Sequence, residues 1–270
     1  LCDRHPTLRR FVYASSAEIY RHGAELPSLV GEDHPVDLSG DMPQRLRDRV
    51  EADLMVCARA GLCRSELMVL RFAELLAPDS GSQLADYLGS RVCLRAIGFD
   101  PMIEVISIDD AVRATLAAVR SHAQGVVNVP GADVLPLSVA IEKAGRRELL
   151  LPDPAVSVLY GARALARGTE FAWRMSRWRF RWGGTLDGER ARRVLGYTPQ
   201  VRVDFAAVAR AGSPYQPVGA MVRMSRSTRP PCRWHASSPA PQTRQLRQQP
   251  PSKIHDGPTS FLPRNTSLRG

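Results

Sequence analysis

Apolar runs of strand length alternate with amphipathic segments of helical length over most of the chain. The runs at 104–108 and 125–129 are rich in valine and isoleucine, which favours buried strands. In the segments around them, apolar residues recur at spacings of three and four, as in helices that pack on one side. The chain therefore mixes strands and helices. The predicted helices cover residues 44–60, 110–121, 138–145, 155–168 and 187–195.

The segment 10–16 is the most informative of the predicted strands. Residues 11–13 have the aromatic and β-branched character of a buried strand, and Ser15 and Ser16 follow where the chain turns. Ligands bind at the carboxyl ends of strands in open α/β sheets, so these two hydroxyls are candidate site residues. The alternative is a polar turn with no further role.

The predicted helix 44–60 has one apolar stripe and one charged side. Residues four apart share a helix face, so Arg45 and Arg49 can approach the same ligand. The alternative for both is a solvated helix face, with exposed pairs at four-residue spacing such as Arg49 with Asp53. The apolar stripe consists of Leu46, Val50, Leu54 and Cys57.

Six short motifs follow one another over residues 10–200. They are Arg10-Phe-Val-Tyr-Ala-Ser-Ser-Ala-Glu-Ile-Tyr20, Glu32-Asp33-His34-Pro35, Val69-Leu70-Arg71-Phe72, Ile106-Ser107-Ile108-Asp109-Asp110-Ala111, Val126-Val127-Asn128-Val129-Pro130-Gly131 and Leu195-Gly196-Tyr197-Thr198-Pro199. In this order and spacing they resemble the motifs of the NAD-dependent epimerase/dehydratase family, the extended short-chain dehydrogenase/reductases. Within that family, UDP-glucose 4-epimerase-like proteins are the most similar.

The resemblance implies an α/β fold with a Rossmann-like, doubly wound parallel sheet that binds NAD or NADP and a nucleotide sugar. Ser16 falls on the family's catalytic serine, which hydrogen-bonds the reacting oxygen. Alignment of residues 50–53 with the family's helix puts Arg45 at the tyrosine and Arg49 at the lysine of Tyr-x-x-x-Lys. A guanidinium stays protonated and cannot act as a general base. Arg49 can still hold a cofactor ribose or phosphate.

The same resemblance assigns the remaining site residues. Ser15, Arg49 and Phe72 are predicted to contact the cofactor, and Glu74 and Met102 to face the substrate. Glu74 stands where the family presents an asparagine to the sugar nucleotide, and its negative charge is unfavourable beside a diphosphate. Met102 stands where relatives often have an arginine for that diphosphate. We therefore expect the family reaction to be impaired in this chain.

Purely structural roles are the alternative for several motif residues. Asp109 or Asp110 can cap the helix that begins there, and Asp187 can cap the helix at 187–195. Asn128, at a strand end, can tie down a turn. Gly196 with the proline three residues later is a usual helix stop.

The family's Gly-rich strand, turn and helix, which cradle the dinucleotide pyrophosphate, have no counterpart in this sequence. The chain begins with Leu1 rather than methionine. We therefore predict a fragment, or a reading frame whose start was assigned late, that lacks the family's N-terminal βαβ units. The resemblance stops near Ala211, and we predict that a change of reading frame added the residues after it.

The positive charge of the chain is concentrated in its last segment. The whole chain carries a net charge of +10, and residues 213–270 hold nine basic residues, one acidic residue and ten of the 21 prolines. Such a segment cannot bury enough apolar surface to fold. We predict two parts: an epimerase/dehydratase-like domain at 1–212 and a disordered basic tail at 213–270. The tail could act as a basic arm for nucleic acid or an anionic membrane, but a non-homologous extension is the preferred interpretation.

The remaining composition indicates a reduced, cytoplasmic protein. The five cysteines are Cys2, Cys57, Cys63, Cys93 and Cys232, and their spacing predicts neither a zinc site nor a disulfide framework. The six histidines are scattered, so no metal site is expected. There is no signal peptide or apolar run of membrane-spanning length, so no membrane partner is expected, and the Asn265 sequon is attributed to chance.

Residues 84–212 are predicted to form a small mixed α/β region on the substrate side. Its unusual feature is the cluster of aromatic residues and arginines at 171–182. Alternating tryptophan and arginine can stack a nucleotide base. The preferred interpretation is that the aromatic side chains pack on the domain and the arginines stay in water.

The sequence thus predicts an NAD(P)-dependent nucleotide-sugar epimerase/dehydratase-like protein, an isomerase or oxidoreductase by family, whose reaction is impaired. An active fragment would need a substitute for the missing tyrosine, such as Tyr13 or Tyr20. The alternatives are a catalytically silent nucleotide-binding module or a degenerate fragment without a ligand. Partners are expected to be a nucleotide sugar and, by resemblance, a second copy in a homodimer, whereas nucleic acid is not expected.

Overall fold

The structure, a computed structural model, describes residues 7–78, 80–167 and 171–211 of the chain. The chain divides into two units, Leu1–Ser225 and Arg226–Gly270, and all described residues belong to the first. The predicted tail at 213–270 therefore lies outside the described residues, as do Cys2, Cys232 and the Asn265 sequon.

The central sheet has three parallel strands in the order β1-β3-β7. They are β1 (Arg10–Ser16), β3 (Glu66–Phe72) and β7 (Gly125–Val129). Residues 67–71 of the middle strand are all buried, as expected for a strand covered on both faces. The register sets Ser15 opposite Arg71 and Ser16 opposite Phe72, so the predicted site residues of both strands meet at one edge of the sheet.

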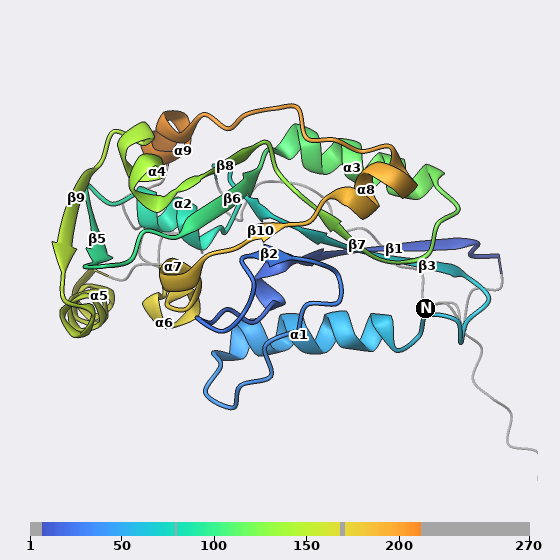
Figure 1. Cartoon of the computed structure of the whole chain (residues 1–270), viewed down its shortest axis with the longest axis horizontal. Helices are drawn as coiled ribbons and strands as arrows, with labels where there is room; N and C mark the ends of the chain where they lie inside the picture. Colours follow the sequence, from blue (N-terminus) through green and yellow to red (C-terminus); the bar gives the residue numbers. More distant parts are fainter. Residues whose placement is uncertain (1–6, 79, 168–170, 212–270) are drawn as a thin grey trace, which may run out of the picture. The chain divides into compact units, whose positions relative to one another are not determined.

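Helices cover both faces of this sheet, as the prediction of a doubly wound fold requires. Helix α1 (Gln44–Cys57) contacts β1 and β3 from one face. On the other face α3 (Ile108–Arg120) contacts β1 and β3, and α8 (Glu189–Leu195) contacts β7 (Figure 1). Alanines at the α3 and α8 contacts let these helices approach the sheet closely, because Ala114, Ala118 and Ala191 are all fully buried.

Three small sheets form the mixed region, mostly from the predicted range 84–212 and partly from two strands that come earlier in the chain. The strands β4 (Glu74–Leu75), β6 (Met102–Ile106) and β8 (Asp133–Pro136) pair in that order, β4 parallel and β8 antiparallel to β6. The other two sheets pair β5 (Val92–Ala96) with β9 (Arg147–Leu151), and β2 (Leu29–Val30) with β10 (Thr185–Leu186). The remaining elements are the 3-10 helix η1 (Ala17–Ile19) and helices α2 (Gln83–Leu88), α4 (Leu137–Lys143), α5 (Asp153–Arg167), α6 (Trp173–Ser176), α7 (Arg179–Trp182) and α9 (Phe205–Ala211).

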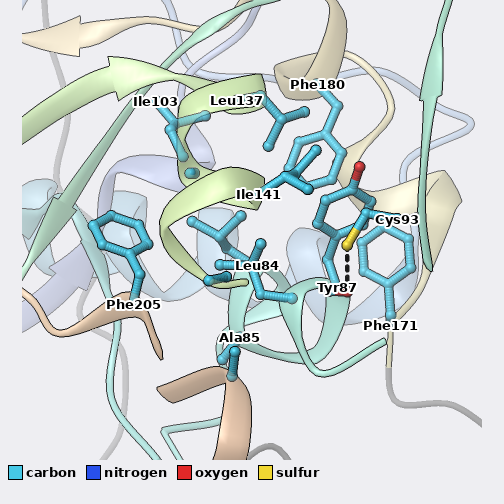
Figure 2. Close-up of a cluster of buried hydrophobic side chains, with 14 of the residues drawn as sticks. Leu84, Ala85, Tyr87, Cys93, Ile103, Leu137, Ile141, Phe171, Phe180 and Phe205 are labelled. Carbon is cyan, nitrogen blue, oxygen red and sulfur yellow. Dashed lines mark hydrogen bonds between the residues drawn. The ribbon is translucent and has the colours of Figure 1, made fainter. Parts of the chain in front are cut away.

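An aromatic cluster holds α6 and α7 against this region. Figure 2 shows Tyr87 of α2 beside Phe171 and Phe180, with ring centroids 5.3 and 5.0 Å away. Trp173 is also buried, whereas Trp178 is 44% exposed. The prediction for residues 171–182 is thus correct for most of the aromatic side chains. It is wrong for two arginines, because the side chains of Arg179 and Arg181 are only 16% and 13% exposed and both form ion pairs.

The N-terminus of α3 corrects a capping prediction. Neither Asp109 nor Asp110 caps the helix, because Ser107 occupies the cap position and its hydroxyl accepts a hydrogen bond from Asp110 N. Asp110 is instead fully buried, and its carboxylate accepts bonds from the backbone N–H groups of Gln200 and Val201. The side chain therefore ties the segment after α8 to the first turn of α3.

At α8 the prediction is wrong at one end and correct at the other. The N-cap residue is Gly188 and not Asp187, although Asp187 Oδ1 still accepts a bond from Glu189 N at the first residue of the helix. At the other end Gly196 adopts a left-handed conformation with a φ of 61°, which stops the helix as expected.

Candidate functional site

A cavity of about 470 Å³ opens where β1 and β3 end, at the predicted position of the site. Helix α3 supplies an apolar wall through Ile108, Val112 and Leu116, each about half exposed. The polar side is built from predicted residues. Five of the seven predicted site residues line this cavity: Ser15, Ser16, Arg49, Phe72 and Glu74.

The two serines have different roles at the end of β1. Ser15 Oγ donates a hydrogen bond to Asp53 Oδ2 at 2.5 Å, so its proton is directed toward α1. Ser16 Oγ accepts a bond from Glu18 N at 3.2 Å and caps η1. Among the described residues, none accepts the proton of the Ser16 hydroxyl. Ser16 can therefore donate a hydrogen bond to a ligand in the cavity.

Arg49 belongs to a set of four charged side chains that we call the rim cluster: Glu18, Arg49, Glu74 and Arg179. Arg49 Nη1 pairs with Glu18 Oε2, and Arg179 Nη1 lies 3.5 Å from Glu18 Oε1. Arg179 Nη2 lies 2.5 Å from Glu74 Oε2. Two arginines and two carboxylates thus compensate one another at the border of the cavity. The predicted exposed pair of Arg49 with Asp53 is wrong, because each residue has another partner.

Glu74 is held in place more firmly than its predicted role suggested. Its Oε1 accepts bonds from Ser82 Oγ at 2.6 Å and from Leu84 N at 2.9 Å, in the first turn of α2. Backbone N–H groups at a helix N-terminus favour a negative charge. Together with Arg179, they compensate the charge that seemed unfavourable in the sequence alone.

Two of the predicted residues lie outside this cavity. Arg45 is exposed and does not line the cavity, but its Nη2 donates to O of the lining residue Gly81 at 3.3 Å. Met102 is 40% exposed and lines a separate small cavity of about 40 Å³. Arg49 therefore lines the main cavity, whereas Arg45 and Met102 do not.

Beneath the site lies a chain of polar side chains that we call the buried network: Asp53, Arg71, Tyr20 and Asn128. Arg71 donates from Nη2 to Asp53 Oδ1 at 2.6 Å and from Nη1 to Tyr20 Oη at 3.1 Å. Tyr20 in turn donates to Asn128 Oδ1 at 2.7 Å, and Asn128 Nδ2 donates to Val30 O. All four residues are at most 4% exposed. The network joins α1, β3, β7 and β2, and the bond from Ser15 to Asp53 connects it to β1.

The ionisation of the buried network is set by its internal bonds. Burial raises the pKa of the Asp53 carboxyl, but hydrogen bonds from Arg71 and Ser15 outweigh it and hold the pKa below its ordinary value. Burial lowers the pKa of Arg71, but its bonds to Asp53 and Tyr20 raise it above the ordinary value. Both groups are therefore charged at neutral pH and form a buried ion pair.

Neither tyrosine proposed as a substitute base is suited to that role. Tyr20 is 1% exposed, and burial raises its pKa despite the hydrogen bond from Arg71. The pKa of Tyr13 is also raised, by burial and then by the charge of Asp53. Tyr13 does not line the cavity. A general base works best with a pKa near the working pH, and both shifts move the phenols away from it.

Two titratable groups line the small cavity, the half-buried His22 and the buried Glu104, and the sequence prediction missed both. Burial and the charge of Arg179 lower the pKa of His22 to about 4, so its neutral Nδ1–H donates to Gly183 O at 2.8 Å. Burial raises the pKa of Glu104 to about 7, although Leu186 N and Gly131 N donate to its oxygens. A glutamate in the apolar run Met-Ile-Glu-Val-Ile was the available signal for Glu104.

The described residues limit other kinds of site. They contain no group of histidine, cysteine and acidic side chains that could hold a metal ion. None of the helices in this part of the chain is long and apolar enough to cross a membrane.

The amino-acid sequence is similar to that of proteins from mycobacteria. No family model matches. The chain is 28% identical over 206 residues to an uncharacterized protein of Mycobacterium tuberculosis and to one of Mycobacterium bovis. In each case the match covers 74% of this chain and 53% of the relative. The chain thus spans about half the length of the curated relatives it matches.

Comparison with solved structures shows that the chain shares its fold with proteins solved in complex with NAD or NADPH. UDP-glucuronic acid 4-epimerase from Bacillus cereus in complex with NAD gives a TM-score of 0.53 at 15% identity, over 77% of this chain and 61% of that chain. RMD from Pseudomonas aeruginosa complexed with NADPH gives 0.52 at 12% identity, over 75% and 66%. At such identities the likeness shows the fold alone.

Proposed function

We propose that this chain is a nicotinamide-nucleotide-binding protein of the nucleotide-sugar epimerase/dehydratase type whose reaction is impaired. The observation that carries the proposal is the lining of the 470 Å³ cavity. It offers an apolar wall, a free serine hydroxyl and a guanidinium, but its titratable groups are only Glu18, Arg49 and Glu74, all in the rim cluster. Both carboxylates are paired with arginines, so the lining suits binding of a ligand better than proton transfer to or from it.

The lining fits the nicotinamide end of NAD or NADP. A flat ring can lie against Val112 and Leu116 of α3, because both side chains are exposed to the cavity. Ser16 can donate to an oxygen of the ligand, and Arg49 can hold a ribose hydroxyl or a phosphate. The pyrophosphate end is different. Within the described ranges, no Gly-rich turn leads from a strand into a helix to receive it.

The lining also explains why the reaction should be impaired. Bound NAD would accept a hydride from a sugar carbon and return it, and the sugar hydroxyl must lose a proton as the hydride leaves. Ser16 can hydrogen-bond that hydroxyl oxygen but has no partner to take its proton. Arg49 stays protonated. The position of the family's tyrosine is held by Arg45, which does not line the cavity and bonds to Gly81.

A catalytically silent nucleotide-binding module remains the second candidate. It is favoured by the rim cluster, because an enzyme site with two compensated arginines offers little net charge to an anionic substrate. The chain spans 53% of its curated relatives, so the activity and substrates of the whole protein are part of this proposal.

A fluorescence titration of NADH tests the binding claim. Val112 lines the cavity and Val119 does not, yet both lie on α3 and are 50% and 54% exposed. We expect saturable binding to the wild-type chain and to Val119→Trp, and weakening by about tenfold or more in Val112→Trp, because the indole fills the space for the ring. Equal binding to both variants, or none to the wild type, would exclude the cavity as the cofactor site.

A further inference from the structure

Glu18 has an unusual position among the side chains of the site. It lines the main cavity, the small cavity with His22 and a third cavity beside α6, so it stands where the three meet. Its side chain is 15% exposed. The 3-10 helix η1 fixes its backbone, because Glu18 N donates to Ser16 Oγ. The end of β1 therefore directs this carboxylate into the centre of the site.

Glu18 joins two arginines that come from distant parts of the chain. Arg49 of α1 binds one carboxylate oxygen and Arg179 of α7 binds the other. Two guanidinium groups on the two oxygens of one carboxylate are close enough to bind one phosphate or two linked phosphates. Such groups form the short, charge-assisted hydrogen bonds that phosphate recognition uses.

The two glutamates of the rim cluster differ in how firmly they are held. Glu74 is bound by Ser82 and by the backbone of Leu84 in addition to Arg179. Within the described ranges, the Glu18 carboxylate has no hydrogen-bond partner other than the two arginines. It can therefore leave them without breaking a bond to the backbone, whereas Glu74 cannot.

We propose that Glu18 determines the anion selectivity of this site, and that a phosphate or diphosphate group binds by displacing its carboxylate from Arg49 and Arg179. The inference rests on the proposed function and names the ligand chemistry of the same site. In the ligand-free chain the Glu18 carboxylate occupies the place of that anion. A ligand must separate it from both arginines, so Glu18 weakens the binding of phosphorylated ligands and leaves the affinity for uncharged ones unchanged.

Calorimetric titration with inorganic pyrophosphate tests this role. Glu18→Gln keeps the size of the side chain and removes its charge, so we expect pyrophosphate to bind about tenfold tighter than to the wild type. Removing Arg49 as well, in Glu18→Gln/Arg49→Gln, should return the affinity to the wild-type level or below. An unchanged affinity in Glu18→Gln would overturn the proposal, and so would a gain that persists in the double variant.

Glu25→Gln is the matched control, because it removes the same charge from an exposed pair with Arg21, 63% and 55% exposed. An equal gain in this control would show a general charge effect and also overturn the proposal. Glu18→Ala serves as the second variant if the glutamine variant fails to fold by circular dichroism. An NADH titration of the same variants separates the two proposals. Tighter pyrophosphate binding without NADH binding would support the role of Glu18 and remove the cofactor proposal. NADH binding without tighter pyrophosphate binding would support the cofactor proposal and overturn the role of Glu18.

Discussion

The buried network and the rim cluster both pair arginine with carboxylate side chains, but the two groups differ in their access to water. In the buried network, Asp53 is 0% and Arg71 is 4% exposed, and each has partners for its polar atoms. In the rim cluster, the side chain of Arg49 is 35% exposed and Glu18 is bound only through arginines among the described residues. Burial, and not residue type, separates a structural ion pair from one that a ligand can replace.

The same difference in burial explains why the position of a residue in the family motif does not predict its role in this protein. Asp53 and Arg49 lie one helical turn apart on α1, yet Asp53 points under the sheet to Arg71 and Arg49 points into the cavity. The first stabilises the fold and the second is available for binding. Substitutions in the two groups should therefore differ in their effects, and loss of a buried charge should have the largest.

Loss of Arg71 should reduce stability more than any other change considered. Arg71→Ala leaves the buried Asp53 carboxylate and the Tyr20 hydroxyl without their charged partner. Breaking a buried pair from one side costs about 3–5 kcal/mol. Urea unfolding measures the change, with Arg21→Ala in the exposed pair as the control at under about 1 kcal/mol. Similar losses in the two variants would contradict the distinction between buried and exposed pairs.

Loss of the Tyr20 hydroxyl should have a smaller effect. Tyr20→Phe keeps the ring but leaves Asn128 Oδ1 and one Arg71 N–H group unpaired inside the protein. We expect a loss of about 1–3 kcal/mol in the free energy of unfolding. Because Tyr20 is assigned no catalytic role, NADH affinity should not change. A stable Tyr20→Phe variant that has lost NADH binding would show that the hydroxyl belongs to the site.

The pH dependence of stability should depend on His22. Its pKa of about 4 lies below the ordinary 6.5, so the unfolded chain takes up a proton first as the pH falls. The stability that His22 contributes is present above pH 6.5 and is lost as the pH falls toward 4. As the pH falls from 6.5 to about 4, the melting temperature of His22→Gln should therefore fall less than that of the wild type. Parallel curves for the two proteins would rule out a buried neutral histidine.

Glu104 changes the stability with pH in the opposite direction to His22, but its contribution is the same in the wild type and in His22→Gln. Its raised pKa means that the stability it contributes is present below its ordinary value of 4.5 and is lost as the pH rises through about 7. Both proteins retain Glu104, so the difference between their curves reports His22 alone.

Loss of Arg49 should have the smallest effect on stability. Its ion pair with Glu18 is partly exposed, and such pairs contribute about 0–1 kcal/mol. Arg49→Gln should therefore unfold within about 1 kcal/mol of the wild type while NADH binding weakens. A loss as large as that of Arg71→Ala would place Arg49 among the structural residues, and unchanged NADH binding would remove it from the site.

Much of the fold could be predicted because its elements have strong local patterns. The strand at β1, the serines at its end and the helix stop at Gly196 result from apolar runs and turn chemistry. The cap of α3 was wrong because serine and aspartate compete for the same role in Ser-Ile-Asp-Asp, and only the packing of Asp110 against residues 200–201 decides between them.

The site was predicted less completely, because its main feature depends on contacts distant in sequence. Arg179 is 161 residues from Glu18, and no spacing rule connects them. The same holds for Arg71, which appeared in the sequence as part of a strand and proved to be the centre of the buried network. Residue-by-residue alignment located the cavity through Ser16, Arg49 and Phe72 but could not indicate which charges compensate one another.

The most direct test of the central claim is to measure binding and chemistry on the same sample. The wild-type chain is saturated with NAD, mixed with UDP-glucose, UDP-galactose or UDP-glucuronic acid, and followed by the absorbance of reduced nicotinamide. The account predicts saturable NADH binding but no stoichiometric reduction of NAD, because both carboxylates in the cavity lining, Glu18 and Glu74, are held by arginines rather than free to take the sugar proton. Reduction of one NAD per chain with any of these sugars would contradict it and show that a proton acceptor reaches the site.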